Sequence, residues 1–309
     1  MRILIELPTW LGDAVMTTPA IENLLSNYNI PQVTIIGSSV SVEIMKDHPS
    51  VVKTFILSKK YRHLFKLSQN LSEFDIFFSF RGSFRTKILG LLISSKKKYQ
   101  YKKNIFQDQH QVEKYNRFIN DCLNSEYSAG KLKIYTKFES KVHTKSLVVG
   151  INPGASYGNA KRWYPEEFSK VAAELSRDFK IIIFGGPNEL SIAKDIEDDL
   201  INKGVTNVIN IAGRTSISDL IEQISNLDLF VTNDSGPMHL AASFQVPTIS
   251  IFGPTRDSET SQWMNNKSVI VKKRLDCQPC MKRTCPLHHH NCMKLIKADD
   301  VLNAIETIS

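Results

Sequence analysis

The segment Thr232–Arg256 (TNDSGPMHLAASFQVPTISIFGPTR) restricts the fold of this chain more than any other. The apolar run Leu229–Thr232 leads into it and predicts a strand. After an acidic, glycine-bearing turn, Met238–Ser243 predicts a helix and Thr248–Phe252 a second strand. A strand, a turn, a helix and a strand in this order form the unit from which parallel sheets are built. We therefore expect an α/β fold.

The same alternation of strand and helix patterns continues along the 309 residues and predicts two doubly wound domains. The predicted strands are Arg2–Leu7, Val33–Ile36, Thr54–Leu57, Ile76–Phe80, Leu147–Asn152, Lys180–Phe184, Val208–Asn210, Leu229–Thr232 and Thr248–Phe252. The predicted helices are Ala14–Tyr28, Val40–Asp47, Tyr61–Leu71, Phe84–Leu92, Asp108–Asn124, Pro165–Arg177, Glu189–Lys203, Ser218–Ser225, Met238–Ser243 and Ala298–Ile308.

The stretch Glu126–Ser146 carries few strong signals, so we place the domain boundary near its end, with domains at 1–145 and 146–309. The last predicted helix, Ala298–Ile308, either closes the second domain or packs back on the first. Ligands of doubly wound sheets bind beyond the carboxyl ends of the strands. We therefore expect the binding site in a cleft between the two domains.

Composition is that of a globular protein, with 42% apolar and 23% charged residues. The absence of an 18-residue apolar run and of a signal-peptide pattern at MRILIELPTW predicts a cytoplasmic protein. Positive charge is uneven, because residues 1–145 hold 22 Lys and Arg against 12 Asp and Glu, whereas 146–309 hold 17 against 19. The first half either meets a negative partner, such as nucleic acid, anionic lipid or a phosphorylated glycan, or presents a solvated basic surface.

The turn Asp234–Pro237 combines two chemical preferences. Backbone N–H groups at the start of the following helix are unpaired and favour phosphate. The Asp234 carboxylate repels phosphate and is suited to accept hydrogen bonds from hydroxyl groups. A sugar nucleotide satisfies both preferences. His239, on the first turn of this helix, is of a kind more often structural than catalytic.

The first strand runs into Leu7-Pro8-Thr9-Trp10-Leu11-Gly12-Asp13-Ala14, which lacks the GxGxxG pattern of dinucleotide-binding proteins. Asp13 stands at or near the start of the predicted helix, where Asp is a favoured N-cap. Alternatively, its carboxylate takes a proton from an attacking hydroxyl. The apolar neighbours Trp10 and Leu11 would raise the pKa of such a base.

The turn from Asn152 to Trp163 has the composition of a diphosphate cradle. Gly154 and Gly158 permit close backbone approach. Ser156 offers a hydroxyl, and Lys161 with its neighbouring arginine supplies positive charge. The GK[ST] ending of a P-loop is missing, so ATP hydrolysis is not implied.

Glu189 follows a third strand-to-helix turn, Gly185-Gly186-Pro187-Asn188, and two roles suit it. Its negative charge at the helix start stabilises the helix dipole. It is equally able to accept hydrogen bonds from the vicinal hydroxyls of a ribose.

Four of the five cysteines lie close together near the C-terminus, together with three consecutive histidines. The four are Cys277, Cys280, Cys285 and Cys292. This spacing is compatible with a structural zinc ion, although the gaps are irregular and reduced thiols need no metal. Even a bound ion would be structural, because the acid–base and phosphate elements lie elsewhere in the chain.

Taken together, these segments resemble glycosyltransferase family 9, the ADP-heptose:lipopolysaccharide heptosyltransferases, over nearly the whole chain. The residues that carry the resemblance are Gly12-Asp13-Ala14, PGASYGNAKRWYPEEF, Phe184-Gly185-Gly186-Pro187 and TNDSGPMHLAA followed by PTISIFGPT. The patterns PGA…AKRW and NDSGPMH are most like the type II members of the family. The serine-bearing phosphate turn departs from the threonine pair of the type I members.

The resemblance implies a GT-B fold of two Rossmann-like domains, with the acceptor bound by domain 1–145 and the ADP-sugar by domain 146–309. It implies an inverting transfer of heptose from ADP-heptose to a lipopolysaccharide core, with no metal ion required. The expected location is the inner face of the inner membrane of a Gram-negative bacterium. There the basic first half would meet the membrane surface and an acceptor rich in phosphates and carboxylates.

The resemblance also implies individual roles. Asp13 would be the general base, and Arg81 and Arg85 are expected acceptor contacts. The expected donor contacts are Ser156 and Lys161 at the diphosphate, Glu189 at the ribose, Thr215 at the adenine, Asp234 at the heptose hydroxyls, Ser235 and Gly236 at the phosphates, and His239.

Three alternatives stay open at this point. One is another GT-B enzyme that uses a UDP-sugar, and a second is a type I or type III heptosyltransferase with a different core acceptor. The third is a non-enzymatic protein that binds nucleic acid through the basic half and a zinc-bound Cys/His cluster. No basic motif interleaved with aromatic residues supports the third, so no nucleic-acid partner is expected.

Overall fold

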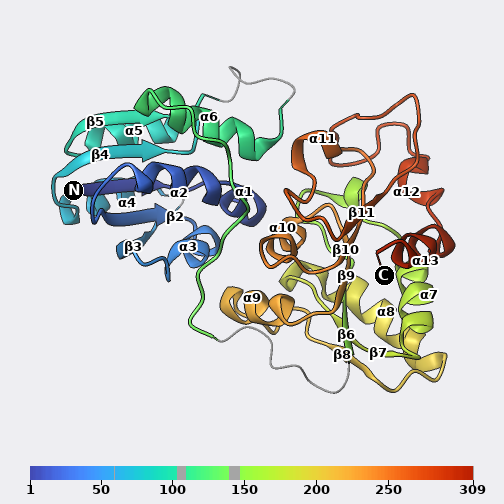
Figure 1. Ribbon diagram of the computed structural model, residues 1–309. Coiled ribbons are helices and arrows are strands. Elements are labelled where there is room, and N and C mark those ends of the chain that lie inside the picture. The colour runs from blue at the N-terminus through green and yellow to red at the C-terminus, as the bar shows by residue number, and fades with distance from the viewer. Residues whose placement is uncertain (59, 103–108, 139–146, 309) are drawn as a thin grey trace. The chain divides into compact units, whose positions relative to one another are not determined.

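The computed structural model describes residues 1–58, 60–102, 109–138 and 147–308, and the chain divides into two compact units (Figure 1). Unit 1 comprises Met1–Lys137 and unit 2 Phe138–Ser309. The boundary predicted after residue 145 lies within 139–146, outside the described residues. Each unit is described by itself below.

Unit 1 contains a five-stranded parallel sheet in the order β3-β2-β1-β4-β5. The strands are β1 (Arg2–Glu6), β2 (Gln32–Gly37), β3 (Val51–Ile56), β4 (Phe74–Ser79) and β5 (Ser95–Gln100). The central strands β1, β2 and β4 are apolar and almost completely buried, as expected for a sheet covered on both faces. This confirms the predicted parallel α/β architecture.

The helices of unit 1 form two layers around this sheet. They are α1 (Leu11–Met16), α2 (Thr18–Ser26), α3 (Ser39–Met45), α4 (Tyr61–Asn70), α5 (Phe84–Leu92) and α6 (Gln111–Leu123). Right-handed crossovers put α4 and α5 on one face and α1 to α3 on the other, where α6 packs against α2. On their inner side α4 and α5 bury Leu64 and Leu89 against the sheet residues Leu4 and Phe77.

Unit 2 contains a six-stranded parallel sheet in the order β11-β10-β9-β6-β7-β8. The strands are β6 (Leu147–Asn152), β7 (Phe179–Ile183), β8 (Val208–Asn210), β9 (Leu229–Asn233), β10 (Thr248–Ile251) and β11 (Ser268–Val271). The order reverses between β6 and β9, so the loops that follow these two neighbouring strands emerge at the topological switch point. This edge is where a doubly wound sheet binds its ligand.

The main helices of unit 2 are α7 (Pro165–Leu175), α8 (Leu190–Asn202), α9 (Ile217–Ser225), α10 (Gly236–Ser243) and α13 (Ala298–Glu306), with short α11 (Asp257–Thr260) and α12 (Asn291–Lys294). Local signals set their starts. Pro165 occupies the first turn of α7, and Ser216 with Asp219 forms a capping box at α9. The closing helix α13 packs against α7 and β11.

Several elements differ from the sequence prediction, and the strand β11 and the short helices α11 and α12 were not predicted. The first helix begins at Leu11 rather than Ala14 and breaks at Thr17, so that Trp10, and not Asp13, is its N-cap residue. The edge strand β5 was not predicted because its sequence, SKKKYQ, is hydrophilic. Exposed lysines are a common device for protecting the edge of a sheet from unwanted pairing.

Gly150 in β6 lies where a side chain would not fit. A Cβ atom there would come within 2.5 Å of Leu227, 2.7 Å of Phe230 and 2.8 Å of Phe184. We expect Gly150→Ala to lower the free energy of unfolding by about 1–3 kcal/mol through overpacking. Calorimetric melting of the variant measures this change.

Gly130→Ala is the matched control, because nothing lies within 4 Å of a Cβ atom at Gly130. Its melting temperature should stay close to that of the unmodified protein. Equal effects of the two substitutions would contradict the packing argument.

Candidate active site

Two loops of unit 2 meet at the carboxyl ends of the neighbouring strands β6 and β9. Lys161, from the loop after β6, and Asp234, directly after β9, form an ion pair with 2.5 Å between Nζ and Oδ2. The two side chains are only 12% and 4% exposed. The pair therefore joins the two segments to which sequence reasoning gave phosphate binding and hydroxyl binding.

Further contacts fix this pair. The Thr255 hydroxyl donates to Asp234 Oδ2 at 2.6 Å, and the Asp234 N–H donates to the carbonyl of Ile251 at 3.1 Å. The Lys161 ammonium lies 4.8 Å from the centre of the Tyr157 ring, within cation–π range. Removing one partner of a buried pair typically costs about 3–5 kcal/mol, because the other charge stays unpaired.

A hydrogen-bond network connects the same loops. The Asn152 side chain donates to Thr232 Oγ1 at 2.9 Å and to Ser235 Oγ at 3.1 Å. Ser235 is the N-cap residue of α10, but its hydroxyl does not cap the helix. The N–H groups that open α10 at Gly236 are thus left uncapped by this side chain, an arrangement that favours an anion.

The Glu189 carboxylate lies close to the backbone of two glycines, Gly186 and Gly154. Its Oε2 accepts a hydrogen bond from the Gly186 N–H at 2.8 Å, and its Oε1 lies 3.7 Å from the Arg162 guanidinium. A Cβ atom at Gly154 would come within 2.0 Å of Oε2, so only glycine permits this approach. Oε2 therefore stabilises the turn that carries Glu189, as expected for a charged residue at a helix start. Oε1 faces Arg162 in the loop after β6.

The remaining predicted donor residues occupy different environments. Ser156 is exposed in the turn after β6, and Thr215 is half-buried in the loop between β8 and α9. His239 is buried on α10, with 3% of its surface exposed. Among the predicted donor residues, Lys161 and Asp234 are therefore the two that form an ion pair with each other.

In unit 1, Asp13 is the third residue of α1 and is half-buried. The expectation of an N-cap is wrong, because the helix starts two residues before it. The Tyr115 hydroxyl, from α6, donates to Asp13 Oδ1 at 3.4 Å. Burial, followed by the nearby Asp13 charge, raises the pKa of Tyr115 well above its usual range, so this phenol stays a donor at neutral pH.

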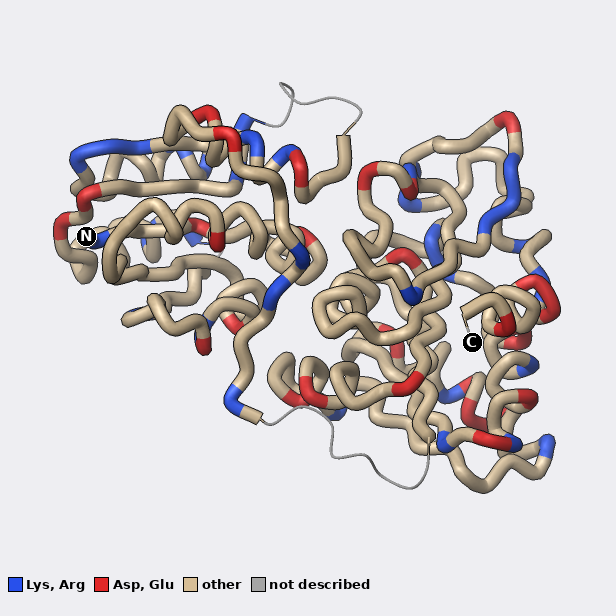
Figure 2. Tube along the Cα trace, viewed as in Figure 1, with Lys and Arg blue, Asp and Glu red and all other residues tan. Residues whose placement is uncertain are grey.

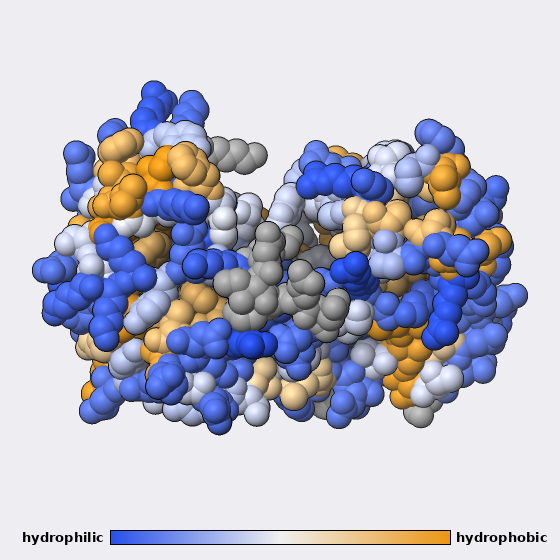
Figure 3. All heavy atoms as spheres, turned by 90° about the horizontal axis from the view of Figure 1, so that it is seen from above, coloured by the Kyte–Doolittle hydropathy of each residue, from blue (hydrophilic) through white to orange (hydrophobic). Residues whose placement is uncertain are grey.

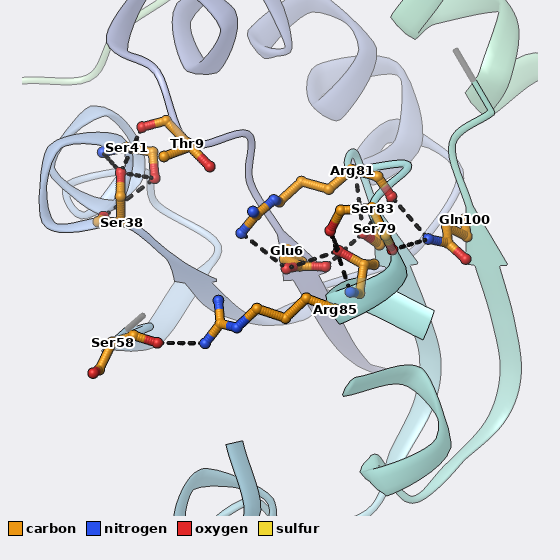
Figure 4. A network of polar contacts seen from close by, with 11 residues as sticks. Glu6, Thr9, Ser38, Ser41, Ser58, Ser79, Arg81, Ser83, Arg85 and Gln100 are labelled. Atoms are coloured by element: carbon orange, nitrogen blue, oxygen red, sulfur yellow. Dashed lines mark hydrogen bonds and ion pairs between the residues drawn. The ribbon is translucent and has the colours of Figure 1, made fainter. Parts of the chain in front are cut away.

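A second carboxyl group, Glu6, lies at the end of β1 and is 1% exposed. Ser79 Oγ donates to Glu6 Oε2 at 2.6 Å, and the Arg81 guanidinium lies 3.4 Å from Oε1 (Figure 4). Burial raises the pKa of Glu6, although Ser79 and Arg81 act in the opposite direction. Arg85 donates to the carbonyl of Ser58. The two arginines predicted to contact the acceptor are thus held at the carboxyl edge of the unit 1 sheet.

The four C-terminal cysteines line one pocket. Its lining residues are Ala160, Pro254, Cys277, Gln278, Cys280, Cys285, Pro286, Leu287, His289, His290 and Cys292. Burial, with smaller contributions from the other three sulfurs, raises the pKa of Cys292 to about 11. Within the described ranges, no group of three or more His, Cys, Asp or Glu side chains that could hold a metal ion is present.

The cysteine-bearing loop braces the loop that carries Lys161. The Arg283 carbonyl accepts a hydrogen bond from the Ala160 N–H at 3.0 Å, and the Tyr157 hydroxyl donates to the Met281 carbonyl at 2.7 Å. Gly158 lies so close to the Arg283 backbone that a Cβ atom would approach its carbonyl oxygen to 2.4 Å. The C-terminal loop therefore supports the site without contributing to its charge pair.

Sequence reasoning missed three residues that the structure places at these edges: Glu6, Tyr115 and Thr255. A sequence signal existed for Glu6, because a carboxylate inside the apolar strand RILIE is unusual. Tyr115 and Thr255 lie 102 and 21 residues from their partners, so only the fold reveals them.

Comparisons with known proteins agree with this geometry. The profile of glycosyltransferase family 9 (heptosyltransferase) matches residues 75–291. Lipooligosaccharide heptosyltransferase 2 of Campylobacter jejuni (serotype O:6) is 38% identical, over 100% of this chain and 99% of that protein. The relative of the same description from Haemophilus influenzae is 24% identical, over 88% of each chain.

The fold has solved counterparts. The structure of the E. coli ADP-heptose LPS heptosyltransferase II superposes with a TM-score of 0.82 at 18% identity, over 100% of this chain and 98% of that one. At this identity the likeness establishes the fold, which is GT-B. None of the helices within the described residues has both the length and the apolar character that crossing a bilayer requires.

The raised pKa of Glu6 predicts a pH dependence of stability. Because native Glu6 holds its proton more tightly than the unfolded chain does, this contribution is complete below the ordinary glutamate pKa, about 4.3. It is lost as pH rises through the native pKa. The stability advantage of the unmodified protein over Glu6→Gln should therefore fall with rising pH. Denaturant unfolding of both proteins across this range measures it, and an advantage that grows with pH would contradict the assignment.

Proposed function

This chain belongs to glycosyltransferase family 9, and we propose from that premise that it transfers heptose from ADP-heptose to the inner-core heptose of lipooligosaccharide or lipopolysaccharide. This is the reaction of a type II heptosyltransferase. The full-length similarity to proteins described as lipooligosaccharide heptosyltransferase 2 supports the substrate assignment. The reaction would take place in the cytoplasm, at the inner face of the inner membrane of a Gram-negative bacterium.

The observation that carries the proposal is the buried pair of Lys161 and Asp234 beside the start of α10. This edge holds a cation and a helix start without a side-chain cap, which suit a diphosphate, next to a carboxylate that suits sugar hydroxyls. In our proposal Lys161, Ser156 and the backbone of Ser235 and Gly236 bind the diphosphate.

Other residues of unit 2 would complete donor binding. Asp234 accepts hydrogen bonds from the heptose, Glu189 Oε1 from the ribose, and Thr215 contacts the adenine. His239, buried on α10, is the remaining expected donor contact. No metal ion is required in this scheme, because the cation and the helix N-terminus stabilise the negative charge that develops on the leaving ADP.

Asp13 would act as the general base. An acceptor hydroxyl attacks the anomeric carbon of the heptose, the bond from that carbon to the diphosphate oxygen breaks, and the proton passes to Asp13. One displacement inverts the anomeric configuration. The hydrogen bond from Tyr115 orients the Asp13 carboxylate for this transfer. Arg81 and Arg85 would bind phosphate or carboxylate groups of the acceptor.

A product assay tests the function as a whole. The protein is incubated with ADP-heptose and a series of truncated core acceptors, and the products are weighed by mass spectrometry. We expect one heptose to be added to the acceptor that already carries one core heptose. Addition to a heptose-free core, or only from a UDP-sugar, would refute the proposal.

Asp13→Asn tests the base. We expect transfer to fall by about 100-fold or more, the range of general-base contributions, while calorimetry shows nearly unchanged affinity for ADP. The ADP measurement is the control, because Asp13 acts on the acceptor. Normal turnover in this variant would remove Asp13 from the mechanism.

Lys161 needs a test that separates phosphate binding from neutralisation of Asp234. Lys161→Met should weaken ADP-heptose binding by about 10-fold or more, the loss of one charge-assisted hydrogen bond. In Lys161→Met/Asp234→Asn no buried carboxylate is left unpaired, so stability should recover while ADP affinity stays low. Recovery of ADP affinity in the double variant would show that Lys161 only neutralises Asp234.

A further inference from the structure

The excess positive charge of unit 1 is concentrated in one part of the sequence. Residues 51–102 contain twelve Lys and Arg but only two acidic residues, Glu73 and Asp75, which gives a net charge of +10. Three consecutive lysines, Lys96 to Lys98, lie along β5 (Figure 2). Most of these cations therefore have no acidic partner within the segment.

The same segment exposes large apolar side chains. Leu91 is 83% exposed, Phe84 71%, Phe65 53% and Tyr61 50%. We call these four residues the α4–α5 face. Tyr61 and Phe65 are four residues apart on α4, and Phe84 and Leu91 are seven apart on α5, so each pair lies along one side of its helix.

The two helices present this face together. They pack side by side, and the Arg85 guanidinium of α5 lies 6.0 Å from the centre of the Tyr61 ring of α4. Leu64 and Leu89 are buried on the inner side, so the exposed side chains lie away from the core. In the space-filling view, apolar areas of unit 1 are bordered by hydrophilic side chains (Figure 3).

Cations lie directly beside these apolar residues. Arg62 and Lys66 are exposed on α4, and Lys87 is exposed on α5 between Phe84 and Leu91. The Lys98 ammonium donates to the carbonyl of Gly90 at 2.8 Å, next to Leu91.

Interleaved aromatic, aliphatic and cationic side chains match the boundary between lipid headgroups and acyl chains. Apolar side chains enter the acyl region there, while Lys and Arg reach back to anionic headgroups. Nucleic acid would use the cations but would leave Leu91 without a partner. An anionic bilayer uses both kinds of side chain.

We propose that the α4–α5 face docks unit 1 on an anionic lipid bilayer. The inference deepens the proposed function, on which it rests in one respect: a lipid-anchored acceptor gives the docking its purpose. The binding itself depends only on this face and on the lipid.

Vesicle co-sedimentation tests the docking. Vesicles of phosphatidylglycerol and phosphatidylethanolamine should bind the protein, and raising the salt concentration should weaken binding. Vesicles of phosphatidylcholine should bind it at least ~10-fold less well, because they lack the anionic headgroups that attract surface Lys and Arg. Equal binding to both vesicles, or binding to neither, would overturn the proposal, as would RNA that displaces the protein from anionic vesicles.

A pair of double variants locates the surface. Phe84→Ser/Leu91→Ser should lower the partition coefficient on anionic vesicles by about 10-fold or more, from the loss of two inserted side chains. The matched control is Leu190→Ser/Ile201→Ser on α8 of unit 2, where the two residues are 51% and 58% exposed. It should bind like the unmodified protein. Equal losses in both variants, with unchanged melting temperatures, would refute the assignment to α4 and α5.

The acceptor assay separates this inference from the proposed function. Phe84→Ser/Leu91→Ser should transfer heptose normally to a deacylated, water-soluble acceptor and poorly to the same acceptor embedded in vesicles. Vesicle binding without any heptose transfer would refute the proposed function but not the proposed docking. Normal transfer to both acceptors, with weak vesicle binding by both the unmodified protein and the variant, would refute only the proposed docking.

Discussion

The buried ion pair between Lys161 and Asp234 is the interaction on which the candidate site of unit 2 depends. Neither charge is tolerable alone at this depth, because desolvation would exceed what any single hydrogen bond returns. The pair therefore couples the loop after β6 to the turn after β9 and fixes the position of the first residues of α10. In the proposed function, a diphosphate that approaches Lys161 would compete with Asp234 for the ammonium group and would release that carboxylate to sugar hydroxyls.

Unit 1 also buries a carboxylate, Glu6, but its ion pair with Arg81 is longer than the pair of Lys161 and Asp234. Glu6 is more deeply buried than Asp234, yet its closest partner is the neutral Ser79 hydroxyl, and the Arg81 guanidinium lies farther away. Burial therefore dominates and raises the pKa of Glu6. The Ser79 and Arg81 contacts tie the end of β1 to the end of β4. This stiffens the edge from which the loop to Asp13 departs.

Local patterns predicted the fold better than the site. The bounds of α5, β6 and β8 agree with prediction because capping residues and apolar runs mark them unambiguously. The strand β5 was not predicted because an exposed edge strand of this kind has no apolar signature. The helices and site residues were predicted one by one, but the pairing of Lys161 with Asp234 was not. That pairing depends on the order of β6 and β9 in the sheet, which no local pattern encodes.

The distribution of charge separates the tasks of the two units. In unit 2, cations such as Lys161 and Arg162 have acidic partners in the fold, so the field of these charges is short-ranged. In residues 51–102 of unit 1, twelve cations face two acidic residues, so their field extends into solvent. A short-range field suits a small nucleotide that is enclosed by the protein, whereas a long-range field suits an extended anionic surface. A glycosyltransferase that transfers a sugar from a soluble donor to a lipid-anchored acceptor needs both a short-range and a long-range field.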